Sequence, residues 1–151
     1  MREILSVDEK RRLVVLNSIF MKIQKTLEAS IGTSSAKVLY IAGSEFGHKY
    51  MEVMKRDNKH TTIQNLLSEL EVTDFVKARF NPDDLSFQVS ESPIALSYGE
   101  SPEPVCHFLA GFFAGIVSEY FGGKDISYIE TSCSAQGDGA CIFEQGDSPP
   151  S

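Results

Sequence analysis

Apolar residues occur first as a run and then at helical spacing in the N-terminal part of the chain. Residues 12–16 (RLVVL) form a short β-rich run, which predicts a strand. Further on, apolar positions recur every three to four residues, as in an amphipathic helix, at Ile19, Phe20, Ile23 and Leu27. Glycine is typical of a helix end, so the pattern predicts a strand that leads into a helix ending near Gly32.

A second helix is expected from Ser34 or Ser35, either of which can cap it, to about Lys55. Its apolar side carries Leu39, Ala42, Phe46 and Tyr50. Gly43 and Gly47 lie four residues apart on this helix. Glycine costs roughly 1 kcal/mol against alanine inside a helix, so the pair indicates that another backbone or a ligand comes close there. Close packing is the simpler of these two interpretations.

The middle of the chain predicts a short helix and a hairpin. A helix can run from Thr61 or Thr62 to Glu71. The alternating runs 75–80 and 85–89 then predict two strands, and residues 81–84 (NPDD) between them are typical of a turn. We therefore expect a β-hairpin after the third helix.

The last third of the chain predicts one long helix and two more strands. After a loop over residues 91–103, Pro104 suits the first turn of a helix that reaches Phe121 and stops at two glycines. Residues 125–131 (DISYIET) and 140–145 (ACIFEQ) then predict strands. The expected order is β-α-α-α-β-β-α-β-β, an α+β fold in which helices pack against a mostly antiparallel sheet.

Composition and charge narrow the functional classes. The 151 residues are 42% apolar and 23% charged, which suits one globular domain. The 14 basic and 21 acidic residues give a net charge of −7, which disfavours nucleic-acid binding. The longest nearly apolar stretch, 105–117, is shorter than the roughly 20 residues of a membrane-spanning helix. The first ten residues lack the features of a signal peptide, so we expect a cytoplasmic protein.

The candidate metal ligands are Cys106, Glu130, Cys133 and Cys141. Zinc prefers four tetrahedral ligands drawn from thiolate, imidazole and carboxylate groups, and a site filled by four protein ligands is structural. The expected strands bring three of the four residues to one corner, and Cys106 would join them from the long helix. The alternative is that these are ordinary buried cysteines, and spacing alone leaves both interpretations open.

A family resemblance rests on the same region: Cys106, Gly111, Gly115, Glu130-x-x-Cys133, Gly137-Asp138 and Cys141-x-Phe143. The pattern resembles the 4-vinyl reductase domain family, whose small-molecule-binding modules are related in fold to TRAPP vesicle-transport subunits and heme nitric-oxide sensors. The match is specific from Cys106 to Phe143 and weaker from Arg12 to Tyr50. Some members are sensor domains of phenol-responsive activators, in which three cysteines and a glutamate hold zinc beside an aromatic-effector pocket.

The resemblance implies zinc on all four candidate ligands, dimerisation, and a pocket between the helices and the sheet. We therefore expect residues 1–10 to be an N-terminal extension, 11–146 a small-molecule-binding domain similar to those of the family, and 147–151 a disordered tail. A two-fold homodimer would form through the N-terminal strand and helices, with Gly43 and Gly47 allowing the close approach of the partner.

The candidate ligand-binding residues are aromatic side chains and one histidine: Tyr128, Phe112, Tyr120, Phe46 and His48. Ligand pockets are largely apolar with a few polar groups, and we expect such a cavity between the long helix and the sheet. Tyr128 lies two residues before Glu130, so it faces the same side of its strand. His48 could donate a hydrogen bond to a bound hydroxyl or carboxylate. Alternatively, the aromatic residues are ordinary core and His48 is a surface residue.

Three functions follow from these patterns. The first is a zinc-stabilised sensor or carrier domain for a hydrophobic or aromatic molecule. The second is a protein-interaction scaffold that resembles TRAPP subunits, and the third, suggested by the family name, is an accessory protein in tetrapyrrole metabolism. No nucleophile motif, zinc-protease motif or glycine-rich phosphate loop occurs, so we do not expect an enzyme.

Overall fold

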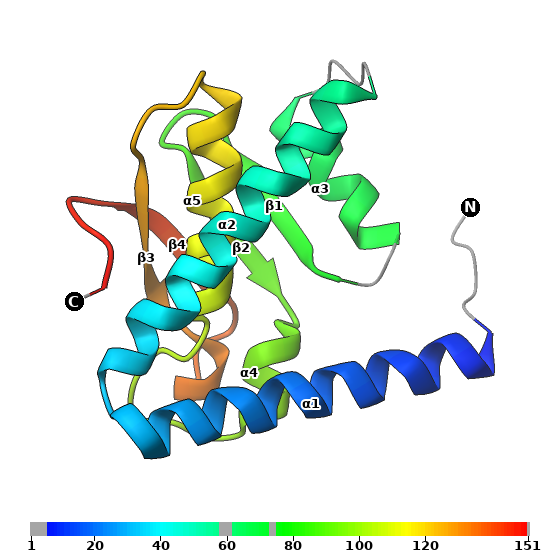
Figure 1. Ribbon diagram of the computed structural model, residues 1–151, viewed down its shortest axis with the longest axis vertical. Helices are drawn as coiled ribbons and strands as arrows, with labels where there is room; N and C mark the ends of the chain where they lie inside the picture. Colours follow the sequence, from blue (N-terminus) through cyan, green and yellow to red (C-terminus); the bar gives the residue numbers. More distant parts are fainter. Residues whose placement is uncertain (1–5, 58–61, 73–74, 151) are drawn as a thin grey trace.

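The computed structural model describes residues 6–57, 62–72 and 75–150. Its helices and strands are α1 (Val7–Ile31), α2 (Ser34–Arg56), α3 (Ile63–Val72), β1 (Lys77–Asn81), β2 (Ser86–Ser90), α4 (Pro93–Tyr98), α5 (His107–Tyr120), β3 (Ser127–Ser132) and β4 (Cys141–Gly146), with a short 3-10 helix, Ser134–Gln136, before β4. The chain folds into one α+β unit, with helices packed on a four-stranded sheet (Figure 1).

Helix α1 replaces the strand that was predicted at residues 12–16, so that prediction is wrong. Ser6 caps the helix: its hydroxyl accepts from the Glu9 N–H at 3.2 Å, and the Glu9 carboxylate accepts from the Ser6 N–H at 2.7 Å. This reciprocal cap starts a helix that then continues through the β-branched run to Ile31. Residues 7–10, expected as an extension, therefore belong to α1, and residues 1–5 lie outside the described residues.

Helices α2 and α5 pack through four glycines. A Cβ atom on Gly43 would overlap the backbone carbonyl of Phe108, and one on Gly111 would overlap that of Tyr40. Gly47 and Gly115 meet in the same way one turn further along. The close packing expected at Gly43 and Gly47 is thus confirmed, but it lies within the chain. The dimer contact expected at these two glycines is wrong, because α5 occupies that surface.

The sheet has the order β1-β2-β4-β3, and all its neighbouring strands are antiparallel. The predicted hairpin is confirmed, with residues 82–85 joining β1 to β2. Helix α5 covers one face of the sheet, where Phe113 stacks on Phe87 with 4.1 Å between ring centroids. Phe143 and Tyr128 complete this interior, and all four rings are fully buried.

Two helix starts differ from the sequence prediction. Helix α4 occupies part of the region expected as a loop, because Ser92 caps it and Pro93 supplies a first residue with a preset backbone angle. Helix α5 begins at His107 rather than at Pro104, which makes Cys106 its N-cap. Its end is as predicted, with Gly122 and Gly123 at positive φ.

The remaining helices begin close to where they were expected. Thr33 rather than Ser34 or Ser35 is the N-cap of α2. The Thr62 hydroxyl accepts from the Asn65 N–H at 3.2 Å at the start of α3, whereas the alternative Thr61 lies outside the described residues. Among the described residues, no helix combines the length and apolar character needed to cross a membrane.

Candidate metal centre and apolar groove

The four candidate metal ligands meet at the end of α5 that points toward the β3–β4 connection. Cys106 is the N-cap of α5, Glu130 lies in β3, Cys133 follows β3, and Cys141 begins β4. One ligand atom from each residue lies within 4.8 Å of the others, and the Sγ atoms of Cys106 and Cys141 are 3.9 Å apart. Residues from separate parts of the chain are therefore brought together as one cluster.

The donor set suits a metal ion. All three cysteines are free thiols and fully buried. Glu130 Oε1 accepts from the Cys106 N–H at 3.2 Å, whereas Glu130 Oε2 is buried and has no hydrogen-bond partner among the described residues. A buried carboxylate oxygen without a partner is costly, and a cation shared with three sulfurs would satisfy it. The cluster could therefore hold a metal ion.

Burial and mutual contact perturb the acidity of this cluster. Burial, together with the nearby Cys133, raises the pKa of Glu130 to about 8. Hydrogen bonds from Cys106 and Cys133 lower the pKa of Cys141 to about 3, whereas the pKa of Cys106 is raised. Without a cation, four negative groups so close together cannot all ionise, and metal binding would release the remaining protons.

A second layer of polar groups holds the ligands in place. The Cys133 N–H donates to Asp138 Oδ2 at 2.9 Å, and the Ser134 N–H donates to Cys141 Sγ at 3.4 Å. The Ser92 hydroxyl lies 3.3 Å from Cys106 Sγ. Sequence analysis assigned no role to these three residues. The Ser92-Pro93 helix start was a signal for one of them, and Asp138 lay within the family motif.

An apolar groove of about 440 Å³ lies on the side of α5 toward α1. Its lining comes from α1, α2, α4, α5 and the residue before β1: Leu16, Asn17, Ile19, Phe20, Ile23, Phe46, Phe75, Pro93, Ile94, Phe108 and Leu109. Asn17 is the one polar residue in this lining. The volume falls within the range typical of small-molecule sites.

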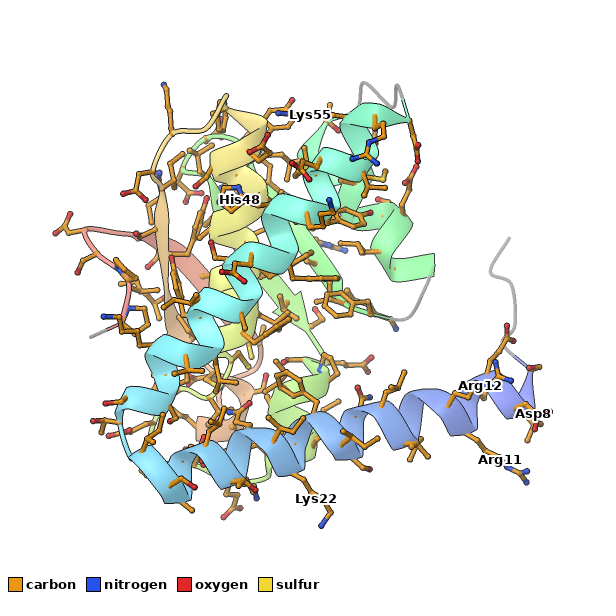
Figure 2. All side chains as sticks on the ribbon, viewed as in Figure 1. Asp8, Arg11, Arg12, Lys22, His48 and Lys55 are labelled. Carbon is orange, nitrogen blue, oxygen red and sulfur yellow. The ribbon has the colours of Figure 1, made fainter. Side chains whose placement is uncertain are left out.

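A more open, polar depression of about 750 Å³ lies between α1 and Ser97. It is lined by lysine, hydroxyl and small side chains: Ser18, Met21, Lys22, Lys25, Thr26, Ala29, Ser30 and Ser97. Figure 2 shows Lys22 pointing away from the body of the molecule, so one wall of this depression is solvated. The apolar groove therefore suits a hydrophobic ligand better, although it is the smaller of the two.

Two of the five candidate ligand residues lie at or behind the groove. Phe46 lines it. Phe112 is fully buried behind Phe46, with 5.4 Å between the ring centroids. The part of the interior that was expected to be hollow, between α5 and the sheet, is filled by the stacked rings of Phe87 and Phe113. The groove thus lies on the other side of α5 from the expected position.

The other three candidate ligand residues lie elsewhere. Tyr128 is buried against the sheet and its hydroxyl donates to the Leu85 carbonyl at 2.6 Å. Tyr120 is partly exposed at the end of α5, beside Phe121. His48 is half-exposed, and its Nδ1 lies 3.4 Å from Glu119 Oε2. The structure therefore does not bring the five residues together at one site.

Comparison with known sequences supports the family resemblance. Residues 85–146 match the 4-vinyl reductase domain. Over 153 aligned residues, the chain is 29% identical to the Phenol regulator MopR of Acinetobacter guillouiae, with 89% of this chain and 27% of that protein covered. The chain thus spans about a quarter of the length of this curated relative.

Comparison with solved structures identifies the fold. The phenol-responsive sensory domain of the transcription activator PoxR, solved with phenol, has a TM-score of 0.69 at 19% identity, covering 85% of this chain and 73% of that one. A vinyl-4-reductase family protein from Methanocaldococcus jannaschii has a TM-score of 0.57 at 19% identity, with 97% and 98% covered. A trafficking protein particle complex subunit 3 from Naegleria fowleri, covalently bound to palmitic acid, has a TM-score of 0.54 at 13% identity, with 91% and 99% covered. The chain therefore carries a 4-vinyl reductase domain over residues 85–146, in a fold that it shares with the PoxR sensory domain and the trafficking subunit.

Proposed function

We propose that this chain is a zinc-stabilised module that binds a small hydrophobic or aromatic molecule as a sensor or carrier. The observation that carries the proposal is the cluster of three buried thiols and Glu130, which lies at the start of the same helix that lines the apolar groove. Phe108 and Leu109 of the groove follow closely after the ligand Cys106. A metal at Cys106 would therefore stabilise the groove as well as the junction between α5 and the sheet.

The metal role in this proposal is structural. Four protein ligands fill a tetrahedral zinc site and leave no open position for water or substrate, as in structural zinc centres. Zinc when bound would link the N-cap of α5 to β3 and to the start of β4, which are far apart in sequence. The function proposed is therefore binding rather than catalysis.

The ligand class follows from the lining of the groove. Its walls are aliphatic and aromatic apart from Asn17, so a molecule that buries mostly apolar surface would gain most there. The names of the relatives agree with this class, since MopR is called a phenol regulator and the PoxR domain was solved with phenol. We therefore favour an aromatic ligand.

The test of the metal site is metal analysis combined with thermal unfolding. We expect one zinc per chain, and a lower melting temperature when a chelator removes it, because metal binding contributes directly to the free energy of folding. Cys141→Ser should bind zinc more weakly and unfold at a lower temperature. A wild-type protein that holds no zinc and whose melting temperature ignores the chelator would show that the cysteines are ordinary core residues.

The test of the groove uses the fluorescent apolar probe anilinonaphthalene sulfonate. Ile23 lines the groove from α1 and is 53% exposed, so Ile23→Glu should weaken probe binding without disturbing the core. Val14→Glu is the matched control, because Val14 lies on the same helix, is 65% exposed and is not part of the groove lining. Equal probe binding by the two variants would contradict the groove as the binding site.

A second candidate function is an interaction scaffold similar to the trafficking subunit. The observation that favours it is the exposed aliphatic surface of α1, where Val14, Val15 and Leu16 are each more than half exposed. Native mass spectrometry of protein purified from its own host distinguishes the two functions. A copurified small molecule favours the sensor or carrier, whereas a copurified protein with an empty groove favours the scaffold.

A further inference from the structure

Ser92 contacts both the candidate metal centre and the helix that forms one end of the apolar groove. It is fully buried, and its hydroxyl oxygen accepts from the Ala95 N–H at 3.3 Å as the N-cap of α4. The same oxygen lies 3.3 Å from Cys106 Sγ. One side chain therefore joins the starts of α4 and α5.

The direction of the contact with Cys106 follows from the chemistry of the two groups. A metal-bound cysteine is a thiolate and has no proton to donate. The Ser92 oxygen already accepts from Ala95, and its one hydrogen is free to point at the sulfur. With metal bound, Ser92 would therefore donate to the Cys106 thiolate while it caps α4.

The two helix starts joined by this contact are also walls of the groove. Pro93 and Ile94 follow Ser92, and Phe108 and Leu109 follow Cys106, and all four residues line the groove. If the cysteine sulfur is fixed by a metal ion, both walls are held through the single contact between Ser92 and Cys106. Without the metal, the sulfur end of this contact is free to move, and the start of α4 is held less firmly relative to that of α5.

We propose that Ser92 is a positioning residue that couples the metal centre to the groove, so that metal binding and ligand binding strengthen each other. The inference rests on the proposed function, since it needs both a metal and an apolar ligand. By linkage, zinc must raise the affinity of the groove for its ligand by the same factor by which the ligand raises the affinity for zinc. Typical coupling of this kind is about fivefold or more.

The experiment measures binding of anilinonaphthalene sulfonate with and without zinc, and the absorption of the cobalt-substituted protein. Zinc should tighten probe binding to the wild type by about fivefold or more, and this ratio should fall toward one in Ser92→Ala. Loss of the hydrogen bond should also shift the cobalt–thiolate charge-transfer band. Ser92→Gly is the second variant, because glycine is an acceptable N-cap and this variant should fold even if Ser92→Ala does not.

Ser118→Ala is the matched control. Ser118 is buried on α5 and makes two hydrogen bonds to Ile126, at 3.1 and 3.2 Å, at the end of the helix away from the cysteines. The substitution should change neither the cobalt spectrum nor the zinc dependence of probe binding, even if it lowers stability.

The possible results separate the coupling from the proposed function. If the wild type binds zinc and the probe independently, the coupling is wrong and the proposed function remains. If Ser92→Ala and Ser92→Gly lower probe affinity equally with and without zinc and leave the cobalt spectrum unchanged, Ser92 is only a helix cap and the coupling is again wrong. If the wild type binds no zinc or no probe, the proposed function fails and the coupling fails with it.

Discussion

Glu130 is the one candidate ligand whose two functional atoms have different environments. One carboxylate oxygen accepts from the Cys106 N–H, and the other is buried without a partner among the described residues. The first contact orients the side chain, and the second oxygen is left for the metal. Tyr128, by contrast, shares its strand face with Glu130 as the two-residue spacing predicts, yet it is a core residue whose hydroxyl donates to a backbone carbonyl.

Glu130→Gln separates orientation from metal binding. The glutamine amide oxygen can still accept from the Cys106 N–H, but a neutral amide is a poor zinc ligand. We expect zinc affinity to fall by at least about tenfold, since even partners outside the ligand set are worth that much. Competition against a chromophoric chelator measures this, with Glu144→Gln on the exposed side of β4 as the control. Unchanged affinity in Glu130→Gln would remove Glu130 from the ligand set.

The raised pKa of Glu130 also predicts a pH dependence of the metal-free protein. A carboxyl group whose folded-state pKa is about 8 contributes stability that is full below its ordinary pKa of 4.5 and is lost as pH rises through 8. Cys141, with its lowered pKa, contributes in the opposite sense, so the wild type is compared with Glu130→Gln. Between about pH 5 and pH 8, the stability of the wild type relative to this variant should fall in denaturant titrations with chelator present. A constant difference would contradict the raised pKa.

At the scale of elements, the sequence predicted most of the fold where one periodic pattern spans the whole element. The helix at α2, the hairpin and the last two strands lie within a few residues of their expected positions. Residues 12–16 were mistaken for a strand because a short valine-rich run carries no period of its own. The Ser6 cap and the continuation to Ile31 make it a helix.

The candidate site was only partly predictable for a related reason. The four metal ligands carry their chemistry in their residue types, so their grouping could be expected from the sequence. The groove depends on which side of α5 the aromatic residues occupy. That choice is made by the four glycines, which draw α2 onto α5, while Phe113 turns toward the sheet. Residue type alone does not distinguish Phe46, at the groove, from Phe87, in the core.

The glycine contact between α2 and α5 leads to a stability prediction. In Gly43→Ala the new methyl group would meet the backbone of Phe108 and Phe112, which cannot rotate away. Overpacking typically costs about 1 to 3 kcal/mol, and we expect a loss near the upper end of this range despite the gain of about 1 kcal/mol in helix propensity. Gly139→Ala is the control, since no heavy atom lies within 4 Å of its added Cβ. Denaturant unfolding compares the two, and equal stabilities would contradict the tight glycine packing.

At the scale of the whole molecule, α1 differs from the other helices in how little of it is covered. Its N-terminal half extends beyond the body of the protein along one side (Figure 1). Asp8, Arg11 and Arg12 lie at this projecting end (Figure 2). Val14 is 65% exposed and Val15 56%, so a contiguous aliphatic surface faces solvent. A single helix in water is stabilised mainly by packing of its apolar face, which this half of α1 lacks among the described residues.

The homodimer expected from the sequence stays a prediction, and α1 is the surface that we now assign to it. The projecting end carries both signs of charge, with Asp8 and Glu9 followed by Lys10, Arg11 and Arg12, so two copies can approach with little net repulsion. Pairing two α1 helices about a two-fold axis would bury the valine surface of each copy against the other. It would also bring the partner helix beside the groove, since Leu16 and Ile19 line the groove from α1.

Sedimentation at micromolar concentration tests this arrangement with two charged variants. Val15→Glu should convert a wild-type dimer into a monomer, because two carboxylates would be buried in the paired surface without partners. Leu96→Glu is the control: Leu96 is 68% exposed but lies on α4, outside the proposed interface, so this variant should remain a dimer. A monomeric wild type would rule out the dimer, and a Val15→Glu dimer would move the interface away from α1. If the partner helix does sit beside the groove, Val15→Glu should also weaken probe binding modestly, because the groove then loses a neighbour that shields its open side.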